Sequence, residues 1–372
     1  MNSITRRQFA RSVLATGMAG LSFQTACAEP ETSLKLNDSL EGIRKRINKK
    51  MKKWLKRYNV PGLSMSFIRE GIPQWHQSFG IKDIENNLPT DESTVFEAAS
   101  LTKPIAAFVA LTLWEEGRLD LDSPMASYLE KSFQDIAPDG YLKITARNVL
   151  CHTSGLPNWR TGQKPPGVAF EPGDRFSYSG EGYMLLQEAL QRITGKPLDV
   201  LCQERVFEPL KMNQSSLVWK PEYQDALALG YGRKISKGMK RKMPDPMAAS
   251  SLISSPHDYS MFVSHVLRSL KKRTDGRHES ICRMMVTPQV DVRAGISWAM
   301  GAGIQTCQDE NAFWHWGNNV NRYHSFVIGY PAHGLGVVVM SNSGNGLPLC
   351  RELVPEIIGG CHPALDWRMV VG

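Results

Sequence analysis

The stretch Phe96-Glu97-Ala98-Ala99-Ser100-Leu101-Thr102-Lys103-Pro104 places a serine three residues ahead of a lysine and leads into an apolar run. Between residues 104 and 116 the apolar positions recur at helical spacing, and Gly117 ends the pattern. Because residues three apart on a helix share a face, we expect Lys103 to lie one turn beneath Ser100. A desolvated lysine can be neutral enough to activate a serine at neutral pH. The stretch therefore predicts a catalytic pair, Ser100 as nucleophile and Lys103 as its base; the alternative is an N-cap serine beside a surface lysine.

The Ser-x-x-Lys pattern is weak by itself, and this chain contains a second copy. Ser269-Leu270-Lys271-Lys272 also matches, but it lies in a basic run and no apolar helix follows it. We interpret that copy as accidental, so the position of Ser100 ahead of a helix is what distinguishes the first one.

Length and composition indicate a soluble globular protein. The chain has 372 residues, of which 42% are hydrophobic and 22% charged. That length is enough for one large domain or two modest ones, and no internal repeat is present.

The N-terminus differs in kind from the rest of the chain. Arg6-Arg7 precedes a mildly apolar run over residues 13–23, and Ala26-Cys27-Ala28 offers a cleavage site. This order predicts a twin-arginine-type signal peptide over residues 1–28, with export to the periplasm and no stable membrane span after its removal. An N-terminal amphipathic helix is the alternative. Lipid anchoring at Cys27 is another, although Gln24 stands where a lipobox has leucine.

The six cysteines after Cys27 form no C-x-x-C pair and have no histidine at zinc spacing. We expect buried free thiols, and the sequence leaves any pairing open. The six are Cys151, Cys202, Cys282, Cys307, Cys350 and Cys361.

The formal charge is +8, and removing three arginines of the signal leaves 8 − 3 = +5. Much of this excess lies in residues 44–57, where apolar residues recur at helical spacing, so we expect the lysines on the outer face of an amphipathic helix. A polyanion or membrane-surface site is the alternative. No nucleic-acid-binding motif is present, and we expect no nucleic-acid partner.

Two blocks of strands flank a mainly helical middle. The first block is a hairpin over residues 63–69 and 74–79, and the second covers residues 296–305, 312–316, 325–330 and 336–341. Helices are expected over residues 104–116, 183–193 and 347–358. This arrangement predicts an α+β fold, with residues 35–98 plus 284–372 as a sheet domain and residues 99–283 as a helical insertion. The site is expected at their junction.

Further motifs follow the serine in order along the chain. They are Glu115-Glu116-Gly117-Arg118-Leu119-Asp120-Leu121, His152-Thr153-Ser154-Gly155-Leu156-Pro157, Phe176-Ser177-Tyr178-Ser179-Gly180 and Trp314-His315-Trp316-Gly317, with Val60-Pro61-Gly62-Leu63 ahead of it. With these motifs the chain resembles the serine hydrolase family that contains class C β-lactamases, D-alanyl-D-alanine carboxypeptidases and related esterases. The resemblance covers about residues 60–345. It implies a β-lactamase/transpeptidase-like fold, with an antiparallel sheet flanked by terminal helices.

The resemblance also implies a catalytic tyrosine, with one departure. The family has Tyr-x-Asn, in which the asparagine binds a substrate amide, whereas this chain has Tyr178-Ser179-Gly180. Tyr178 is expected to act as base or acid if Lys103 lowers the pKa of its phenol. Gly180 occupies the substrate-binding position without a side chain. A buried structural tyrosine is the alternative.

A second departure concerns the family's Lys-Thr-Gly, which here reads His315-Trp316-Gly317. The resemblance places these residues at the substrate, with His315 where a lysine attracts a carboxylate, a pull that a mostly neutral histidine weakens. Gly317 would allow close substrate approach, and the backbone N–H groups of Ser100 and Asn318 would form the oxyanion hole. The alternative for His315 and Trp316 is a packed strand pair.

Together these features predict a serine hydrolase that acts through an acyl-enzyme on ester, amide or lactam substrates. Esterase-like or D-amino-acid peptidase-like activity is favoured, because both departures weaken recognition of an amide and a carboxylate. A class C-type β-lactamase and a catalytically silent, penicillin-binding-type protein are the alternatives. The expected partner is a small acyl substrate. No cofactor or metal is expected, because the histidines form neither H-E-x-x-H nor a tight cluster. His152 is interpreted as a turn-stabilising residue, with a catalytic base as the alternative.

Overall fold

A computed structural model describes residues 33–130, 140–162, 165–271 and 278–371. The expected signal peptide, residues 1–28, lies outside this range. Within the described residues no helix has the length and apolar character needed to cross a membrane.

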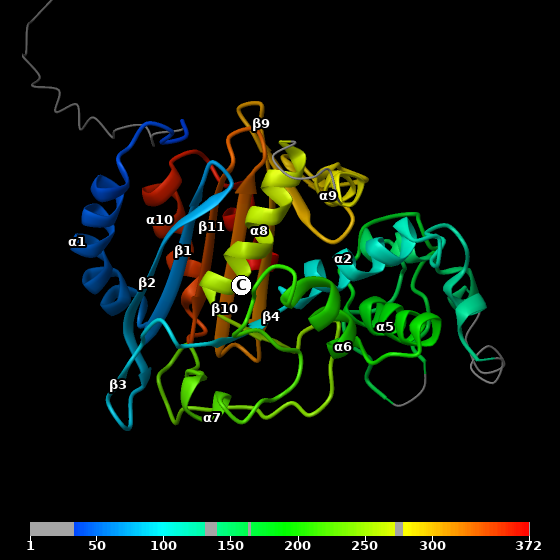
Figure 1. The fold of residues 1–372 in the computed structure, drawn as a ribbon, viewed down its shortest axis with the longest axis horizontal. Coiled ribbons are helices and arrows are strands. Elements are labelled where there is room, and N and C mark those ends of the chain that lie inside the picture. Colours follow the sequence, from blue (N-terminus) through cyan, green and yellow to red (C-terminus); the bar gives the residue numbers. More distant parts are fainter. Residues whose placement is uncertain (1–32, 131–139, 163–164, 272–277, 372) are drawn as a thin grey trace, which may run out of the picture.

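A nine-stranded antiparallel sheet forms the centre of the molecule (Figure 1), in the order β3-β2-β1-β11-β10-β9-β8-β7-β6. Two further strands, β4 and β5, form a separate pair. The strands are β1 Gly62–Arg69, β2 Ile72–Asp83, β3 Leu88–Pro89, β4 Phe96–Ala99, β5 Leu252–Ser254, β6 Val290–Arg293, β7 Ile296–Trp298, β8 Gly303–Cys307, β9 Glu310–Asn319, β10 Tyr323–Tyr330 and β11 Leu335–Ser341.

The two ends of the chain meet in this sheet. β1 pairs with β11 from Leu63 opposite Ser341 to Ile68 opposite Gly336. Both strands are almost wholly buried. The sequence of β11 is a nearly continuous apolar run, whereas β1 alternates apolar residues with the buried Ser64 and Ser66. The prediction that the two strand blocks share one sheet is therefore confirmed.

The second block differs from the prediction in two places. The single strand predicted over residues 296–305 is wrong, because the chain turns between β7 and β8 at Gly301, whose φ is +94°. β6 was not predicted at all. Its residues alternate between half-buried and exposed, so it carries no apolar run that would mark a strand.

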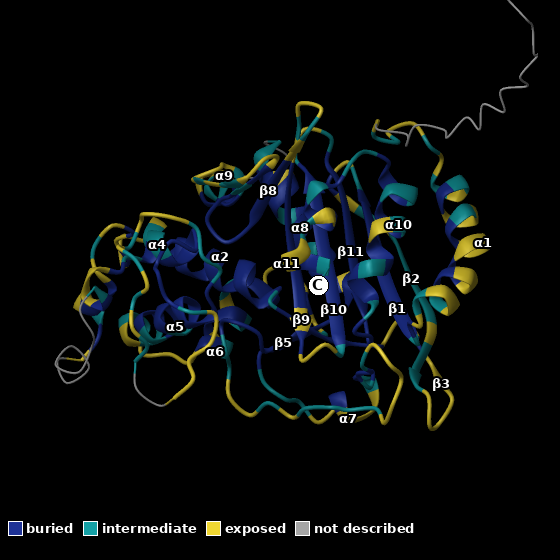
Figure 2. Ribbon diagram, turned by 180° about the vertical axis from the view of Figure 1, so that it is seen from behind, coloured by how far each residue is buried: buried dark blue, intermediate teal, exposed yellow. Residues whose placement is uncertain are grey.

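Helices cover both faces of the sheet (Figures 1 and 2). α8 lies on one face against β1, β2 and β11, and α1 and α10 lie on the other. α1 buries a stripe of Ile43, Ile47, Met51 and Trp54, and its lysines face outward as predicted. The α-helices of the described residues are α1 Leu40–Tyr58, α2 Thr102–Glu115, α4 Ala146–Leu150, α5 Gly180–Thr194, α6 Leu198–Cys202, α7 Tyr223–Ala226, α8 Pro256–Leu270, α9 Glu279–Val286, α10 Gly346–Ile358 and α11 Arg368–Val371.

The helical part lies beside the sheet and is built around α2 (Figure 1). α2 is buried over nearly its whole length and contacts α5, α6 and α9. α8 falls within the predicted helical insertion, residues 99–283, yet it packs on the sheet. The division into domains at these boundaries stays a prediction.

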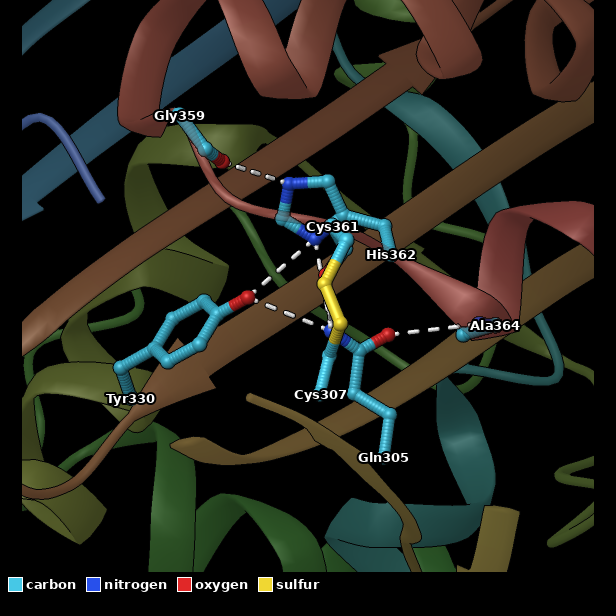
Figure 3. Close-up of a disulfide and its surroundings, with 7 residues drawn as sticks. All are labelled: Gln305, Cys307, Tyr330, Gly359, Cys361, His362 and Ala364. Atoms are coloured by element: carbon cyan, nitrogen blue, oxygen red, sulfur yellow. Dashed lines mark hydrogen bonds between the residues drawn. A yellow bond between two sulfur atoms is a disulfide. The ribbon is translucent and has the colours of Figure 1, made fainter. Parts of the chain in front are cut away.

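Two of the cysteines that were expected to be free form a disulfide instead. Cys307, at the end of β8, bonds Cys361, which follows α10 (Figure 3). Their Cα atoms lie 6.2 Å apart although 54 positions separate them in sequence, so only the fold brings them together. Nearby, the Gln305 amide donates to Tyr330 Oη at 3.2 Å. The other four cysteines of the described chain are buried free thiols, namely Cys151, Cys202, Cys282 and Cys350.

Candidate functional site

Ser100 lies in a sharp turn between β4 and α2. The residue before it, Ala99, has φ +54°, a left-handed conformation that is unusual for a residue with a side chain. The turn is held by Thr102, whose hydroxyl donates to the Ala99 carbonyl at 2.6 Å and accepts from the Leu252 N–H at 2.9 Å. The Tyr259 hydroxyl of α8 donates to the Leu101 carbonyl at 3.0 Å. Neighbouring elements therefore fix the position of Ser100.

Lys103 lies beneath this serine and has no acidic partner among the residues that the structure describes. Its Nζ is 3.0 Å from Ser100 Oγ and donates to the Ala249 carbonyl at 2.7 Å. The side chain is completely buried. Burial lowers the pKa of Lys103 from 10.5 to about 7. At neutral pH a large fraction of Lys103 is therefore a neutral amine whose lone pair can accept the Ser100 proton.

Tyr178 lies above Lys103, and His152 holds it there. The Lys103 Nζ is 4.9 Å from the centre of the Tyr178 ring. The ring centres of His152 and Tyr178 are 4.3 Å apart. The N–H of Ser177 donates to the His152 carbonyl at 2.7 Å, and the N–H of Ser179 donates to His152 Nδ1 at 3.0 Å. His152 thus binds the residues on both sides of Tyr178, which is a positioning role.

The expected low pKa of Tyr178 is wrong. Burial raises the pKa of Tyr178 above its ordinary value, and the nearby Ser100 hydroxyl opposes this only in part. The two hydroxyls form no hydrogen bond of good geometry, and the Tyr178 hydroxyl has no other partner within the described residues. The phenol is therefore protonated at neutral pH and suited to donate a proton, whereas the neutral amine of Lys103 is suited to accept one. His152 is neutral too, because burial and the neighbouring Lys103 lower its pKa.

Ser100 and Tyr178 line an open cavity of about 740 Å³. Half of the residues that line it are apolar or aromatic and most of the others are serines and asparagines. They are Ser100, Asn158, Trp159, Phe176, Ser177, Tyr178, Arg241, Met243, Met247, Ser250, Trp316, Asn318, Asn319, Val320, Asn321 and Met369. We call this cavity the cleft. Its size suits a ligand much larger than an acetyl group.

β9 forms one wall of the cleft. Its pairing with β8 ends at Trp314, whereas its pairing with β10 continues to Asn319. The last five residues of β9 therefore have one unpaired edge. Asn318 and Trp316 line the cleft, and the Trp316 ring centre is 4.8 Å from that of Tyr178. The Ser100 N–H makes no backbone hydrogen bond within the described chain, so it is available for an oxyanion.

His315 points away from the cleft and carries no charge at neutral pH. The side chain is buried, and its Nδ1–H donates to the Trp316 carbonyl at 2.8 Å. Burial, with a smaller contribution from Lys103, lowers the pKa of His315 to about 3. The side chain at the position of the family's lysine is therefore electrically neutral. The sequence predicts a weakened attraction for a carboxylate, whereas a neutral His315 provides no charge for it.

Gly317 has a packing reason that the sequence did not reveal. A Cβ at this position would lie 2.3 Å from both the Ala98 carbonyl oxygen and Ser325 Oγ. Ser325 Oγ itself donates to the Ala98 carbonyl at 2.8 Å. The glycine thus allows β9 to approach β4, the strand that precedes Ser100, in addition to any role in substrate approach.

Gly317→Ala is expected to lower kcat/KM by about 100-fold, because the added methyl group pushes β9 away from Ser100. It is also expected to lower the free energy of unfolding by about 1–3 kcal/mol, as overpacking does. Ester kinetics and urea titration measure the two effects. Gly167→Ala is the control, since a Cβ there meets nothing within 4 Å. Wild-type activity and stability in Gly317→Ala would contradict this explanation.

An amide side chain does lie beside Gly180, but it comes from another segment. A Cβ on Gly180 would lie 2.6 Å from the Asn158 carbonyl oxygen and 3.2 Å from Asn158 Oδ1. The Gly180 N–H donates to Asn158 Oδ1 at 3.1 Å, and within the described residues the Asn158 Nδ2 group, which belongs to a residue lining the cleft, donates no hydrogen bond. No sequence pattern marks Asn158, since the chain contains no Tyr-x-Asn.

Sequence reasoning also missed Arg241, the one charged residue among the described residues that line the cleft. Its guanidinium forms an ion pair with the buried Glu97, which also accepts from Asn319 Nδ2 at 2.8 Å. Glu97 belongs to the quoted stretch around Ser100, and nothing in the sequence indicates its distant partner. Because this charge is already paired, it offers a carboxylate less than a free arginine would.

Within the described chain no group of three or more histidine, cysteine or acidic residues is placed to hold a metal ion. The second Ser-x-x-Lys copy lies elsewhere: Ser269 is buried near the end of α8 and does not line the cleft. The structure thus brings together Ser100, Lys103, Tyr178, Trp316, Gly317, Gly180 and Asn318, and places His315 behind them.

Comparison with solved structures confirms the predicted fold. The octameric penicillin-binding protein homologue from Pyrococcus abyssi is similar with a TM-score of 0.70 and 23% identity, over 84% of this chain and 76% of that one. Among curated proteins, the chain is 23% identical over 347 residues to Protein flp of Staphylococcus aureus (strain N315), covering 87% of this chain and 66% of flp. It is 26% identical over 210 residues to the putative penicillin-binding protein PbpX of Bacillus subtilis (strain 168), covering 53% of this chain and 52% of PbpX. The chain therefore spans just under two thirds of flp and about half of PbpX.

A family model also matches most of the chain. The family model described as Beta-lactamase matches residues 43–353, which include β1, the serine turn, Tyr178 and β9. The chain belongs to the Beta-lactamase family.

Proposed function

We propose that this protein is a serine hydrolase that acts through an acyl-enzyme on Ser100 and prefers esters. One observation carries the proposal: a completely buried lysine, without an acidic partner in the described part of the chain, lies 3.0 Å from the serine hydroxyl, and its pKa is about 7. Burying a lysine costs stability, so a structural role alone gives no reason for it. A base whose pKa is close to the working pH is the most effective one for proton transfer.

The reaction divides the roles among three side chains. Lys103 accepts the proton of Ser100 while the serine oxygen attacks the carbonyl carbon of the substrate. The N–H groups of Ser100 and Asn318 stabilise the resulting oxyanion. Tyr178, protonated because its pKa is raised, donates a proton to the leaving alcohol. In the second half of the reaction a water molecule attacks the acyl carbonyl and gives its proton to the Tyr178 phenolate. The bond between the acyl carbon and the Ser100 oxygen then breaks, and that oxygen takes its proton back from Lys103, so both groups return to their starting states.

The charges in the cleft favour esters over lactams. Penicillins, cephalosporins and peptides with a C-terminal D-alanine all carry a carboxylate, which an unpaired cation would attract. His315 is neutral, and Arg241 is paired with Glu97. A neutral ester has no carboxylate to pair, so the lack of an unpaired cation does not weaken its binding in this cleft.

D-amino-acid peptidase activity is the second candidate. Arg241 lies in the cleft and could share its guanidinium between Glu97 and a substrate carboxylate. A silent, penicillin-binding-type protein is the non-enzymatic alternative, suggested by the name of the PbpX relative.

The test uses a fluorophosphonate probe and three substrates. We expect the probe to label the protein, with the adduct on the Ser100 peptide by mass spectrometry and none on the Ser269 peptide. p-Nitrophenyl acetate should be hydrolysed, whereas nitrocefin turnover should be at least 100-fold lower in kcat/KM. A rapid nitrocefin reaction would favour a true β-lactamase, and release of D-alanine from a D-alanyl-D-alanine peptide would favour the peptidase. Folded protein that resists the probe would support the silent alternative.

Export remains a proposal that rests on residues 1–28, which lie outside the described part of the chain. The charged, apolar and small-residue regions follow one another there as in a twin-arginine-type signal. Periplasmic localisation, and lipid anchoring at Cys27 as the alternative, depend on that sequence alone.

A further inference from the structure

Three large apolar side chains are exposed at the rim of the cleft. They are Trp159, Val320 and Met369, with exposed fractions of 45%, 56% and 44%. They come from three separate parts of the chain: the loop that follows α4, the turn between β9 and β10, and α11. Single exposed apolar residues are ordinary on a protein surface, but three that converge on one cavity indicate a binding surface. We call these three residues the apolar rim.

Val320 is exposed at a conformational cost. Its φ is +47° and that of Asn321 is +53°, so both central residues of the β9–β10 turn are left-handed. Asparagine and glycine suit such a turn, whereas a β-branched valine is an outlier there. Asn318 closes the turn, since its side chain exchanges hydrogen bonds with the Asn321 N–H at 2.9 Å and with Asn321 Oδ1 at 2.8 Å. The side chain of Val320 buries little surface in return, so folding gives no reason for valine.

The interior of the cleft is also lined by apolar and aromatic side chains. Phe176, Trp316, Met243 and Met247 line it, and methionines adapt to apolar groups of different shapes. No acidic residue is among the described residues that line it. The volume of about 740 Å³ corresponds to about 25 water molecules, far more than an acetyl group occupies. A small ester would leave most of this apolar surface in contact with water.

We propose that the cleft recognises a substrate by a large apolar substituent, an alkyl chain or aromatic ring of about six or more carbons, which the apolar rim covers. The substituent is attached to the scissile carbonyl or to its leaving group. This inference rests on the proposed ester hydrolysis at Ser100 and names the class of ester. Burial of the substituent against Trp159, Val320 and Met369 supplies the binding free energy.

Two series of esters test the proposal and locate the substituent. The first is p-nitrophenyl esters from acetate to octanoate, in which the acyl chain grows. The second is acetate esters from ethyl to octyl, in which the alcohol grows. Because the apolar rim covers only part of the alkyl chain of the ester, kcat/KM should rise about 2-fold per methylene in one series, or about 50-fold over six methylenes. The series that shows the rise identifies the side of the scissile bond.

Variants of the rim separate binding from folding. Val320→Asn should lower the octanoate-to-acetate or octyl-to-ethyl ratio about 5-fold and raise Tm by about 1–3 °C, because asparagine tolerates the left-handed turn. Trp159→Ala should lower the same ratio about 10-fold. Ile72→Asn is the matched control, since Ile72 is 51% exposed but does not line the cleft, and it should leave the ratio unchanged. Replacement of a residue with a merely structural role would lower the stability of the protein and would leave the long-to-short ester ratio unchanged.

The outcomes distinguish this inference from the proposed function. If the protein hydrolyses acetate esters and accepts the fluorophosphonate probe but shows no rise in either series, the apolar substituent is wrong and the hydrolase proposal stands. If kcat/KM rises steeply with chain length but Val320→Asn and Trp159→Ala leave that rise unchanged, the proposal that the apolar rim binds the substituent is overturned. Protein that neither hydrolyses any ester nor accepts the probe overturns both proposals.

Discussion

Replacement of Ser100 by alanine is expected to lower kcat/KM for p-nitrophenyl esters by at least about 10⁴-fold, because it removes the nucleophile on which the acyl-enzyme forms. The remaining rate should come from binding and from the oxyanion hole, which the change leaves in place. Fluorophosphonate labelling should disappear. Folding should survive, since Ser100 is only partly buried and the bonds that hold its turn come from Thr102 and Tyr259.

Ser269→Ala is the control for this prediction. Ser269 has the same Ser-x-x-Lys spacing, but it lies near the end of α8 and outside the cleft. Labelling and ester hydrolysis should match the wild type in that variant. Should Ser100→Ala keep its ester activity, the nucleophile would have to be another group, and the proposed function would fail.

Lys103→Met is expected to separate activity from stability. It should lower kcat/KM by about 10³-fold, within the range that a general base contributes. In the wild type, kcat/KM should fall about tenfold per pH unit below pH 7, because protonation of Lys103 removes the base and its pKa is about 7. The measurement is a pH–rate profile of ester hydrolysis, checked against a pH-independent reference ester reaction.

The same substitution should stabilise the protein at low pH. The pKa of Lys103 is about 7 when folded and 10.5 in its ordinary state, so between these values the unfolded chain binds more protons than the folded one. Wild-type stability should therefore rise with pH from about 7 to 10.5, and below pH 7 the full cost of the buried charge, about 5 kcal/mol, is present. Loss of the hydrogen bond to Ala249 offsets about 2 kcal/mol of this. A net gain of about 3 kcal/mol at pH 6 is expected for Lys103→Met.

Urea titrations at pH 6 and pH 10 measure this effect. The gain should be present at pH 6 and should vanish or reverse at pH 10, where the wild-type lysine is neutral. Lys52→Met is the control, since Lys52 is exposed on α1 and its replacement should change stability equally little at both pH values. If Lys103→Met destabilises the protein at pH 6, the buried lysine is a structural residue and its low pKa is not the basis of catalysis.

Local patterns were sufficient for fewer than half of the helices and strands, chiefly the long strands of the sheet and the helices α1, α2, α5 and α10. The apolar stripe of α1, the buried run of β11 and the glycine after α2 each depend on residues close in sequence, and each was predicted correctly. β6 and the break at Gly301 were missed, because an exposed edge strand and a turn between two short strands leave little trace in hydrophobic patterning. The disulfide was missed because Cys307 and Cys361 approach only in the folded sheet.

The features of the candidate site likewise fall into those that local sequence predicts and those that depend on tertiary contacts. Ser100 and Lys103 lie three residues apart, so the sequence by itself determined that a helix start would place one beneath the other. The protonation of Tyr178, the neutrality of His315, the amide that Asn158 supplies beside Gly180 and the ion pair of Glu97 with Arg241 were decided by the tertiary structure alone. Each of these depends on burial or on a contact between segments that lie apart in the sequence, and both arise only in the folded chain.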